Sequence, residues 1–447
     1  MGMAAQQMGK RGRQRSHRRV GCAFGGKSDF GVGVMFRFAM LAPFQVRSFR
    51  FQFPADLATS WAIEMENLVL GWYILVETGS VLALTLYWAL LYLGTLLAPM
   101  FGMLGDRIGQ RTVLCAMRAA YASLGIAVAT LAFAGVLRPY HVFIIAALSG
   151  LIRPSDQGMR SALVAATMPG DRLMATMGVS RTTSDLARIV GALSGAGLFA
   201  VFGLAPVYLA IAGFYATGFL FTLGVSRPPA RPVSAGAARP SPGRDLREGL
   251  VHVWDTPCLL AGMWLAFLVN LTAFPLTSGL LPYVAKEIYG IGQTGLGTLV
   301  ACFSFGSLMG SITVSIAGRA LRPGRMMILF ALGWYAALLV FVNLESPISG
   351  RMVLVIAGIT QALSLVPMNV MLLHSAGERF RGRVMGVRML AIYGVPIGLL
   401  TAGVLIERLG FAATTSLYCL VGAVLTLVIA LRWRSALWPL DAPANNR

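Results

Sequence analysis

Long apolar segments recur along nearly the whole chain and alternate with short polar connectors. A helix of about 20 apolar residues spans the hydrocarbon core of a bilayer, whereas buried helices of soluble proteins are usually shorter and amphipathic. The pattern therefore predicts an all-α polytopic membrane protein with twelve transmembrane helices. We expect the spans at 53–76, 79–101, 112–134, 141–164, 176–200, 203–225, 257–282, 294–317, 326–343, 351–373, 385–406 and 411–432.

Composition supports this prediction and narrows the classes of function. The chain of 447 residues is 57% hydrophobic, with a mean hydropathy of +0.72 and only 12% charged residues. Its net charge of +20 comes from short connectors, which form no continuous basic face, so we expect no nucleic-acid partner. The five cysteines are widely spaced and form no CxxC pair, so neither a metal site nor a disulfide framework is indicated.

The basic residues fall mainly on alternate connectors. One set of connectors holds Arg107, Arg111, Arg172, the run from Arg227 to Arg247, Arg319, Arg322, Arg325, Arg379, Arg381 and Arg383. The other set holds little beyond Arg138, Lys286 and Arg408. Because cytoplasmic loops carry the excess of Lys and Arg, we expect both termini in the cytoplasm and a multi-pass protein of the bacterial inner membrane.

A Pro-, Ala-, Gly- and Arg-rich connector at 226–250 lies between six spans on either side and reads as a cytoplasmic linker. The connectors "PGDRLMATMGVSR" and "AGERFRGRVMGVR", after the fourth and tenth spans, resemble each other, which indicates two related halves. We therefore expect pseudo-symmetric six-helix bundles at 45–225 and 251–435. Residues 1–44 would be a basic, disordered extension, with Met35 or Met40 as alternative starts, and 436–447 a cytoplasmic tail.

The connector "GMLGDRIGQR" between the second and third spans combines glycines, an acid and two arginines. Gly102, Asp106, Arg107, Gly109 and Arg111 match the pattern G-x-x-x-D-[RK]-x-G-[RQ]-[RK] of the major facilitator superfamily, which the chain resembles over roughly residues 45–435. The glycines would let helix ends approach closely, and Asp106 would pair with arginines or helix dipoles of the other half to close a cytoplasmic gate. A simple positive-inside turn would explain the arginines but not the aspartate.

Within that superfamily, the stretch from Arg153 to Gly197 is similar to drug and siderophore exporters related to the enterobactin and macrolide efflux proteins. The resemblance implies proton-coupled efflux of an amphipathic small molecule by alternating access. Gly191 and Gly195 partly match the family's antiporter motif, but its proline is missing. A lysophospholipid or other lipid transporter, or a uniporter, is the alternative. A membrane sensor is less favoured because the sequence shows no sizeable soluble domain, and a membrane enzyme because it shows no catalytic motif. We expect a monomer without a cofactor.

Ionisable residues inside spans are costly, so each is a candidate functional residue. Glu64 and Glu66 in the first span point about 200° apart on a helix, with Asn67 between them. Arg153 and Asp156 lie in the fourth span. Since the resemblance implies that these two helices line the central cavity, the hypothesis is that Glu64 or Glu66 exchanges a proton, tuned by Arg153.

Two alternatives stay open for these charges. Asp156 is the second candidate proton carrier, and a permanently ionised Glu–Arg pair could simply hold helices one and four together. Asp56 is expected to pair with Arg47 and Arg50, and Asp185 with Arg188.

The second half offers no acid in the middle of its spans, so we expect it to supply hydrogen bonds. Its candidates in the substrate cavity are Asn270, Gln361 and Asn369. The expected aromatic lining is Trp72, Tyr73 and Trp264.

Overall fold

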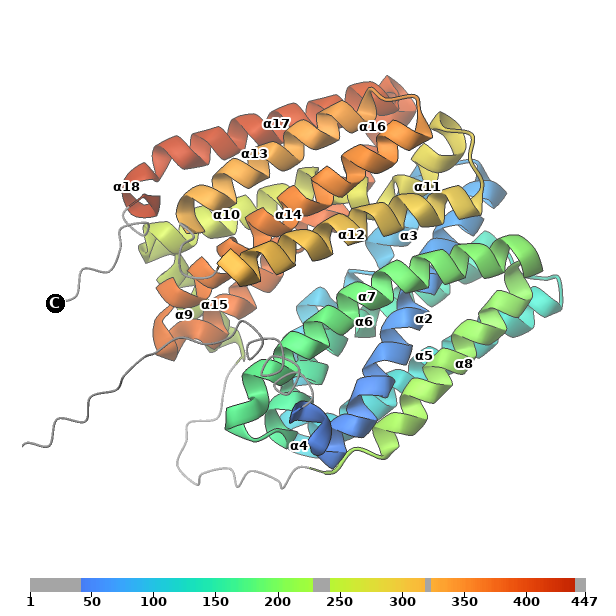
Figure 1. The fold of residues 1–447 in the computed structure, drawn as a ribbon, viewed down its shortest axis with the longest axis horizontal. Coiled ribbons are helices and arrows are strands. Elements are labelled where there is room, and N and C mark those ends of the chain that lie inside the picture. The colour runs from blue at the N-terminus through green and yellow to red at the C-terminus, as the bar shows by residue number, and fades with distance from the viewer. Residues whose placement is uncertain (1–41, 228–241, 318–322, 439–447) are drawn as a thin grey trace, which may run out of the picture.

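The computed structural model describes residues 42–227, 242–317 and 323–438, and within these ranges every regular element is a helix (Figure 1). The expected extension 1–44 and tail 436–447 lie largely outside the described residues. The described part of the chain begins with a short η1 (Ala42–Gln45) and ends just beyond α18 (Arg434–Leu437).

Six spans form the first half, and the second of them is interrupted. They are α2 (Arg47–Thr78); α3 (Val81–Leu90), η2 (Leu93–Leu97) and α4 (Ala98–Ile108), which together make the second span; α5 (Gln110–Phe133); α6 (Pro139–Thr167); α7 (Gly170–Phe202); and α8 (Leu204–Leu223).

Six further spans follow α9 (Pro242–Asp255), and two of these are also irregular. The seventh span runs through α10 (Pro257–Thr272), η3 (Pro275–Gly279), α11 (Leu281–Tyr283) and η4 (Val284–Ile288). The remaining spans are α12 (Gln293–Ala317), α13 (Pro323–Val342), α14 (Pro347–Ser375), the pair α15 (Gly377–Ala391) and α16 (Gly394–Leu409), and α17 (Phe411–Arg432).

The twelve spans predicted from hydropathy are confirmed. Nine segments of the described residues are long and apolar enough to cross a membrane by length and composition. The other three spans are the interrupted second one and the two helices that carry most of the intramembrane charge, α2 and α6. Of the expected linker at 226–250, residues 228–241 lie outside the described part, and from Pro242 the chain forms the amphipathic helix α9.

The two halves repeat the same close helix contacts. A Cβ added to Gly150 of α6 would lie 2.0 Å from the Leu90 carbonyl oxygen, at the end of α3, and the equivalent atom on Gly358 of α14 would lie 2.1 Å from the Phe303 carbonyl oxygen in α12. Only glycine permits such backbone approach. The turns that join α7 to α8 and α16 to α17 are also alike: each has a single glycine with positive φ, +77° at Gly203 and +83° at Gly410.

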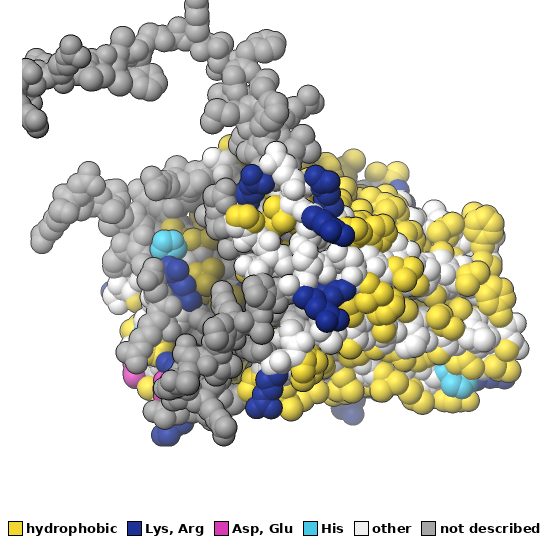
Figure 2. Space-filling model, turned by 90° about the horizontal axis from the view of Figure 1, so that it is seen from below, with side chains coloured by type: hydrophobic (Ala, Val, Ile, Leu, Met, Phe, Trp, Pro, Cys, Tyr) yellow, Lys and Arg dark blue, Asp and Glu magenta, His cyan; other side chains and the backbone are white. Residues whose placement is uncertain are grey.

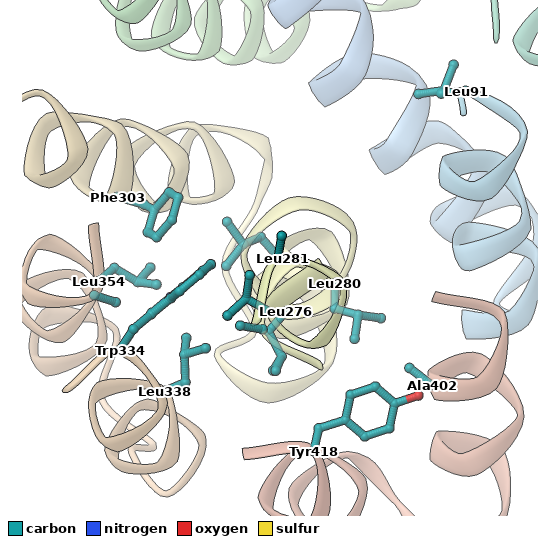
Figure 3. Packing of buried hydrophobic residues seen from close by; sticks show 14 of the residues in the cluster. Leu91, Leu276, Leu280, Leu281, Phe303, Trp334, Leu338, Leu354, Ala402 and Tyr418 are labelled. Atoms are coloured by element: carbon teal, nitrogen blue, oxygen red, sulfur yellow. The ribbon is translucent and has the colours of Figure 1, made fainter. Parts of the chain in front are cut away.

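The two bundles pack against each other through α7 with α12 and through α3 with α16, as the blue–green and yellow–red halves of Figure 1 show. Inside the second bundle, Trp334 of α13 is fully buried and lies between Leu354 of α14 and the leucines of the seventh span (Figure 3). This dense apolar packing gives the second half a continuous core.

The molecule has two different ends. The basic end is the one with the connector carrying Arg107 and Arg111, the connector carrying Arg172, and α9; the opposite end carries the turns at Gly203 and Gly410. In Figure 2 hydrophobic side chains cover much of the visible face, and Lys and Arg side chains gather mainly where the face borders the segments drawn in grey. A hydrophobic belt with basic residues beside it suits a protein embedded in a bilayer.

Candidate functional site

Ion pairs inside the membrane region are concentrated in the first bundle, where they form three groups. One faces the space between the bundles, one lies in the middle of the first bundle, and one lies nearer the basic end. Buried charges are tolerated only when paired, so the partners define what each group can do.

The first group, the pocket pair, consists of Glu64 on α2 and Arg188 on α7. Arg188 Nε lies 3.4 Å from Glu64 Oε1, and the two side chains are 41% and 21% exposed, respectively. Both line a pocket of about 190 Å³ between the two bundles. The pocket is also lined by Asn67 from the first bundle and by Phe274, Phe303 and Gln361 from the second.

The second group, the central pair, is Glu66 on α2 with Arg153 on α6. Arg153 donates to Glu66 Oε2 at 2.8 Å and to Asn67 Oδ1 at 2.6 Å, and the Tyr215 hydroxyl on α8 donates to Glu66 Oε2 at 2.6 Å. Glu66 is only 4% exposed. It lies about 18 Å along α2 from Thr78, at 1.5 Å per residue. Asn67 belongs both to this group and to the lining of the pocket.

The third group binds four helices together near the basic end. Arg118 of α5, fully buried, pairs with Asp56 of α2 and donates to the Thr222 hydroxyl of α8. Arg160 of α6 lies 2.6 Å from Asp156 one turn earlier and 3.8 Å from Asp56. Asp56 is therefore shared between two arginines, and Arg160 between two carboxylates.

The structure separates the two glutamates that the sequence left as alternatives. Glu64 lines the inter-bundle pocket, whereas Glu66 is buried inside the first bundle and pairs with Arg153. Arg188, the partner of the glutamate in the pocket, was not expected there. The only signal for it was its position as an arginine within a span.

Two predicted pairings of charges are wrong. Asp56 pairs with Arg118 and Arg160 rather than with Arg47 and Arg50, because its side chain faces the bundle interior. Asp185 pairs with Arg181 at 3.4 Å, which leaves Arg188 to Glu64.

The second bundle contributes one of its three expected polar residues to the pocket. Gln361, 5% exposed, lines it. Asn270 instead donates at 3.0 Å to the Ala391 carbonyl oxygen at the end of α15. Asn369 on α14 is not among the described residues that line this pocket.

The expected aromatic lining is wrong as well. Trp72 is buried, Trp264 is 47% exposed, and the Tyr73 hydroxyl donates to the Leu137 carbonyl oxygen. The pocket uses other rings, namely Trp88, Tyr92, Phe274 and Phe303. Periodicity could not have shown which face of each helix turns toward the other bundle.

The connector predicted to be a gate has a local role that the structure shows directly. Arg111 at the start of α5 donates to the Thr222 and Leu223 carbonyl oxygens at the end of α8, as a basic residue at a helix C-terminus does. Gly109 has φ +92° between α4 and α5, whereas a Cβ on Gly102 would meet nothing within 4 Å. Arg107 is exposed, and the side chain of Asp106 lies outside the described part of the structure.

The pocket lies where the bundles converge toward the opposite end. A Cβ on Gly403 of α16 would lie 2.3 Å from the Thr85 hydroxyl of α3, and one on Gly297 of α12 would lie 2.5 Å from Ala196 of α7. The Ser80 hydroxyl also donates to Glu407 across the bundles at 3.2 Å. The bundles are therefore closely packed at the opposite end. No group of three or more potential metal ligands occurs among the described residues.

Similarity to known proteins agrees with this architecture. A stretch of 232 residues is 27% identical to the enterobactin exporter EntS of Escherichia coli O1:K1, covering 51% of this chain and 54% of that protein, so the match spans about half the length of this relative. The same holds for EntS of Escherichia coli O127:H6.

Solved structures show the same fold at low sequence identity. A POT family transporter in complex with 5-aminolevulinic acid superimposes with a TM-score of 0.69 at 15% identity, over 88% of this chain and 97% of that one. A bacterial homologue of the human lysosomal transporter Spinster, in an inward-facing and unoccupied conformation, gives 0.65 at 12% identity, over 92% and 99%. Residues 53–396 match the family profile described as Major Facilitator Superfamily, and the chain belongs to this family of membrane transporters.

Proposed function

We propose that the protein is a proton-coupled exporter of an amphipathic small molecule, working by alternating access between its two bundles. The observation that carries the proposal is the pocket pair, a carboxylate and a guanidinium that face a common cavity between the bundles. A cavity lined by four aromatic rings and a few polar groups suits an amphipathic ligand, whose apolar part packs on the rings and whose polar groups meet the pair.

Proton coupling follows from the chemistry of this pair. Protonation of Glu64 removes its attraction for Arg188 and changes the charge of the pair from zero to +1. Substrate affinity must then depend on protonation, and by linkage proton affinity depends equally on substrate. That reciprocity is the requirement for a proton gradient to drive transport.

Alternating access is supported by where the bundles touch. Their tight contacts lie toward the opposite end, through Gly403 against Thr85 and Gly297 against Ala196. Separation of these contacts, with closure of the basic end, would expose the same pocket to the other side. The motif residues Asp106 and Arg107 lie at the basic end, where such a closure would form.

We place the basic end in the cytoplasm of a bacterium, with the chain in the inner membrane and both termini inside. The excess of arginine at that end supports this orientation. Export is supported by the similarity to the enterobactin exporter, and we expect the protein to act as a monomer.

The test uses the purified full chain in proteoliposomes, with enterobactin and ethidium as separate probes and an imposed pH gradient. We expect gradient-driven transport by the unmutated chain and its loss in Glu64→Gln, which mimics the protonated carboxyl. Glu287→Gln serves as the control, since Glu287 pairs with Lys286 at the surface.

Two outcomes would contradict the proposal. Coupling retained in both Glu64→Gln and Glu66→Gln would reject these carboxylates as proton carriers. Movement of lysophospholipid but of neither probe would favour lipid transport instead.

A further inference from the structure

Four buried tyrosines share the first bundle with the central pair, and the hydroxyls of three of them have no hydrogen-bond partner among the described residues. Tyr215 donates to Glu66, while the hydroxyls of Tyr87, Tyr121 and Tyr208 are buried and unpartnered. All four side chains are at most 1% exposed, and all interact electrostatically with Glu66.

These tyrosines come from three helices and are ordered along the first bundle. Tyr208 is four residues into α8 and Tyr87 six residues into α3, which places them about 6 Å and 9 Å along their helices from the opposite end. Tyr121 stacks on Tyr215, with ring centroids 5.4 Å apart, and lies about 18 Å along α5 from Phe133, at the depth of Glu66. The four side chains thus extend from near the opposite end to the level of Glu66, and we call them the tyrosine column.

An unpartnered hydroxyl buried in protein is costly, about 1–3 kcal/mol each. Three such hydroxyls in the bundle that holds the central pair therefore indicate internal water, which usually makes about three hydrogen bonds to otherwise unsatisfied buried groups. Two tyrosines of the second bundle differ: Tyr335 shares a hydrogen bond of 2.7 Å with Thr272, and Tyr418 donates to the Gly398 carbonyl oxygen.

We propose that this column is a hydrated proton relay between the opposite end and Glu66, separate from the substrate pocket. Each oxygen along it accepts a proton from the preceding water or hydroxyl and passes its own proton onward, so no phenol keeps a charge. The carboxylate of Glu66 receives the proton and loses its attraction for Arg153. The inference rests on the proposed proton-coupled transport and adds a second proton-binding carboxylate, Glu66, to Glu64 of the pocket pair, together with the route by which a proton reaches it.

The column is physically separate from the pocket but linked to it by one amide. The described residues that line the pocket include none from α8, where Tyr208 and Tyr215 lie. Asn67, however, lines the pocket and accepts a hydrogen bond from Arg153. When protonation of Glu66 weakens its attraction for Arg153, the hydrogen bond from Arg153 to Asn67 changes. Because Asn67 lines the pocket, protonation of Glu66 then alters the pocket lining although Glu66 itself does not line it.

The experiment compares two transport modes of the full chain in proteoliposomes, with the enterobactin and ethidium probes. Tyr208→Phe and Tyr215→Phe each remove only a hydroxyl. We expect net transport driven by a pH gradient to fall by about tenfold or more, as when a proton-transfer group is removed. Exchange of labelled for unlabelled probe at equal pH requires no net proton movement and should stay within about twofold of the unmutated rate.

Tyr335→Phe is the matched control, because it removes a buried hydroxyl from the second bundle. Tyr87→Phe gives an independent variant if either α8 variant fails to fold. An equal fall of both transport modes would mean that the hydroxyls only support packing, and unchanged gradient-driven transport would mean that they carry no protons. Either result overturns the relay, whereas the absence of gradient-driven transport in the unmutated chain overturns the proposed function itself.

Discussion

The two bundles share their backbone packing and differ in what fills them. Gly150 and Gly358 make equivalent contacts between the second and fourth helices of each half, and Gly203 and Gly410 make equivalent turns. The first bundle places three groups of ion pairs between its helices. The ion pairs found in the described part of the second bundle, Lys286 with Glu287 and Arg383 with Glu248, lie at its ends.

The difference indicates that charge is not needed to hold this architecture together. The second bundle achieves the same arrangement with apolar packing around Trp334 and with hydroxyl pairs such as Thr272 and Tyr335. Desolvation of buried ions offsets most of their mutual attraction, so ion pairs are weak evidence for stability. Their confinement to one half is better explained by a task that requires charge, which is consistent with proton coupling.

The largest expected effect comes from removing Arg118, the ion-paired charge whose side chain is completely buried. Arg118→Met should lower the free energy of unfolding by about 3–5 kcal/mol, because it leaves Asp56 with the more distant Arg160. Thermal unfolding in detergent measures this change. Adding Asp56→Asn should restore part of the loss; if it deepens the loss instead, the charges themselves stabilise the bundle.

The close helix contacts at Gly150 and Gly358 should tolerate an added methyl group equally poorly in both halves. Gly150→Ala and Gly358→Ala each place a Cβ 2.0–2.1 Å from a carbonyl oxygen of the neighbouring helix. Both should destabilise by about 1–3 kcal/mol through overpacking. Melting temperatures of the two variants should fall by similar amounts, with Gly102→Ala as a control that meets no neighbour. A loss confined to one variant would show that the halves are alike in backbone only.

Removal of single tyrosine hydroxyls compares the charged interior of the first bundle with the neutral polar interior of the second. Tyr215→Phe removes a hydrogen bond to a carboxylate and should cost about 1.5–3 kcal/mol, whereas Tyr335→Phe removes a neutral one and should cost about 0.5–1.5 kcal/mol. The same unfolding assay ranks them. The reverse order would indicate that water replaces the lost bond at Glu66.

The smallest effect is expected at the surface. Arg181, with a side chain 67% exposed, lies 3.4 Å from Asp185, and Arg181→Gln should change the free energy of unfolding by less than about 1 kcal/mol. The difference should shrink as salt is added, because exposed ion pairs are screened. A larger, salt-independent loss would mean that the buried Asp185 carboxylate depends on this exposed partner.

The sequence predicted the spans well because a bilayer imposes a length and an apolar composition that a single chain must show. It also identified Glu64, Glu66 and Arg153 as candidate functional residues, because a charge inside a span is costly. It could not assign partners, because Arg188 meets Glu64 only through the packing of α7 on α2. The sequence analysis did not predict α9, although residues 242–255 have an amphipathic pattern, because the Pro-, Gly- and Arg-rich connector before them favours a flexible linker.

The interruption of the second span ties that helix to the other half of the molecule. Its exposed turn at η2 is capped from outside: the Leu96 amide donates to the Tyr393 hydroxyl at 3.0 Å, and Tyr393 lies at the break between α15 and α16. Two helix breaks thus meet and satisfy one another. Any motion that separates the two breaks removes the acceptor of the Leu96 amide, so bending of the second span at η2 requires that this hydrogen bond be broken first.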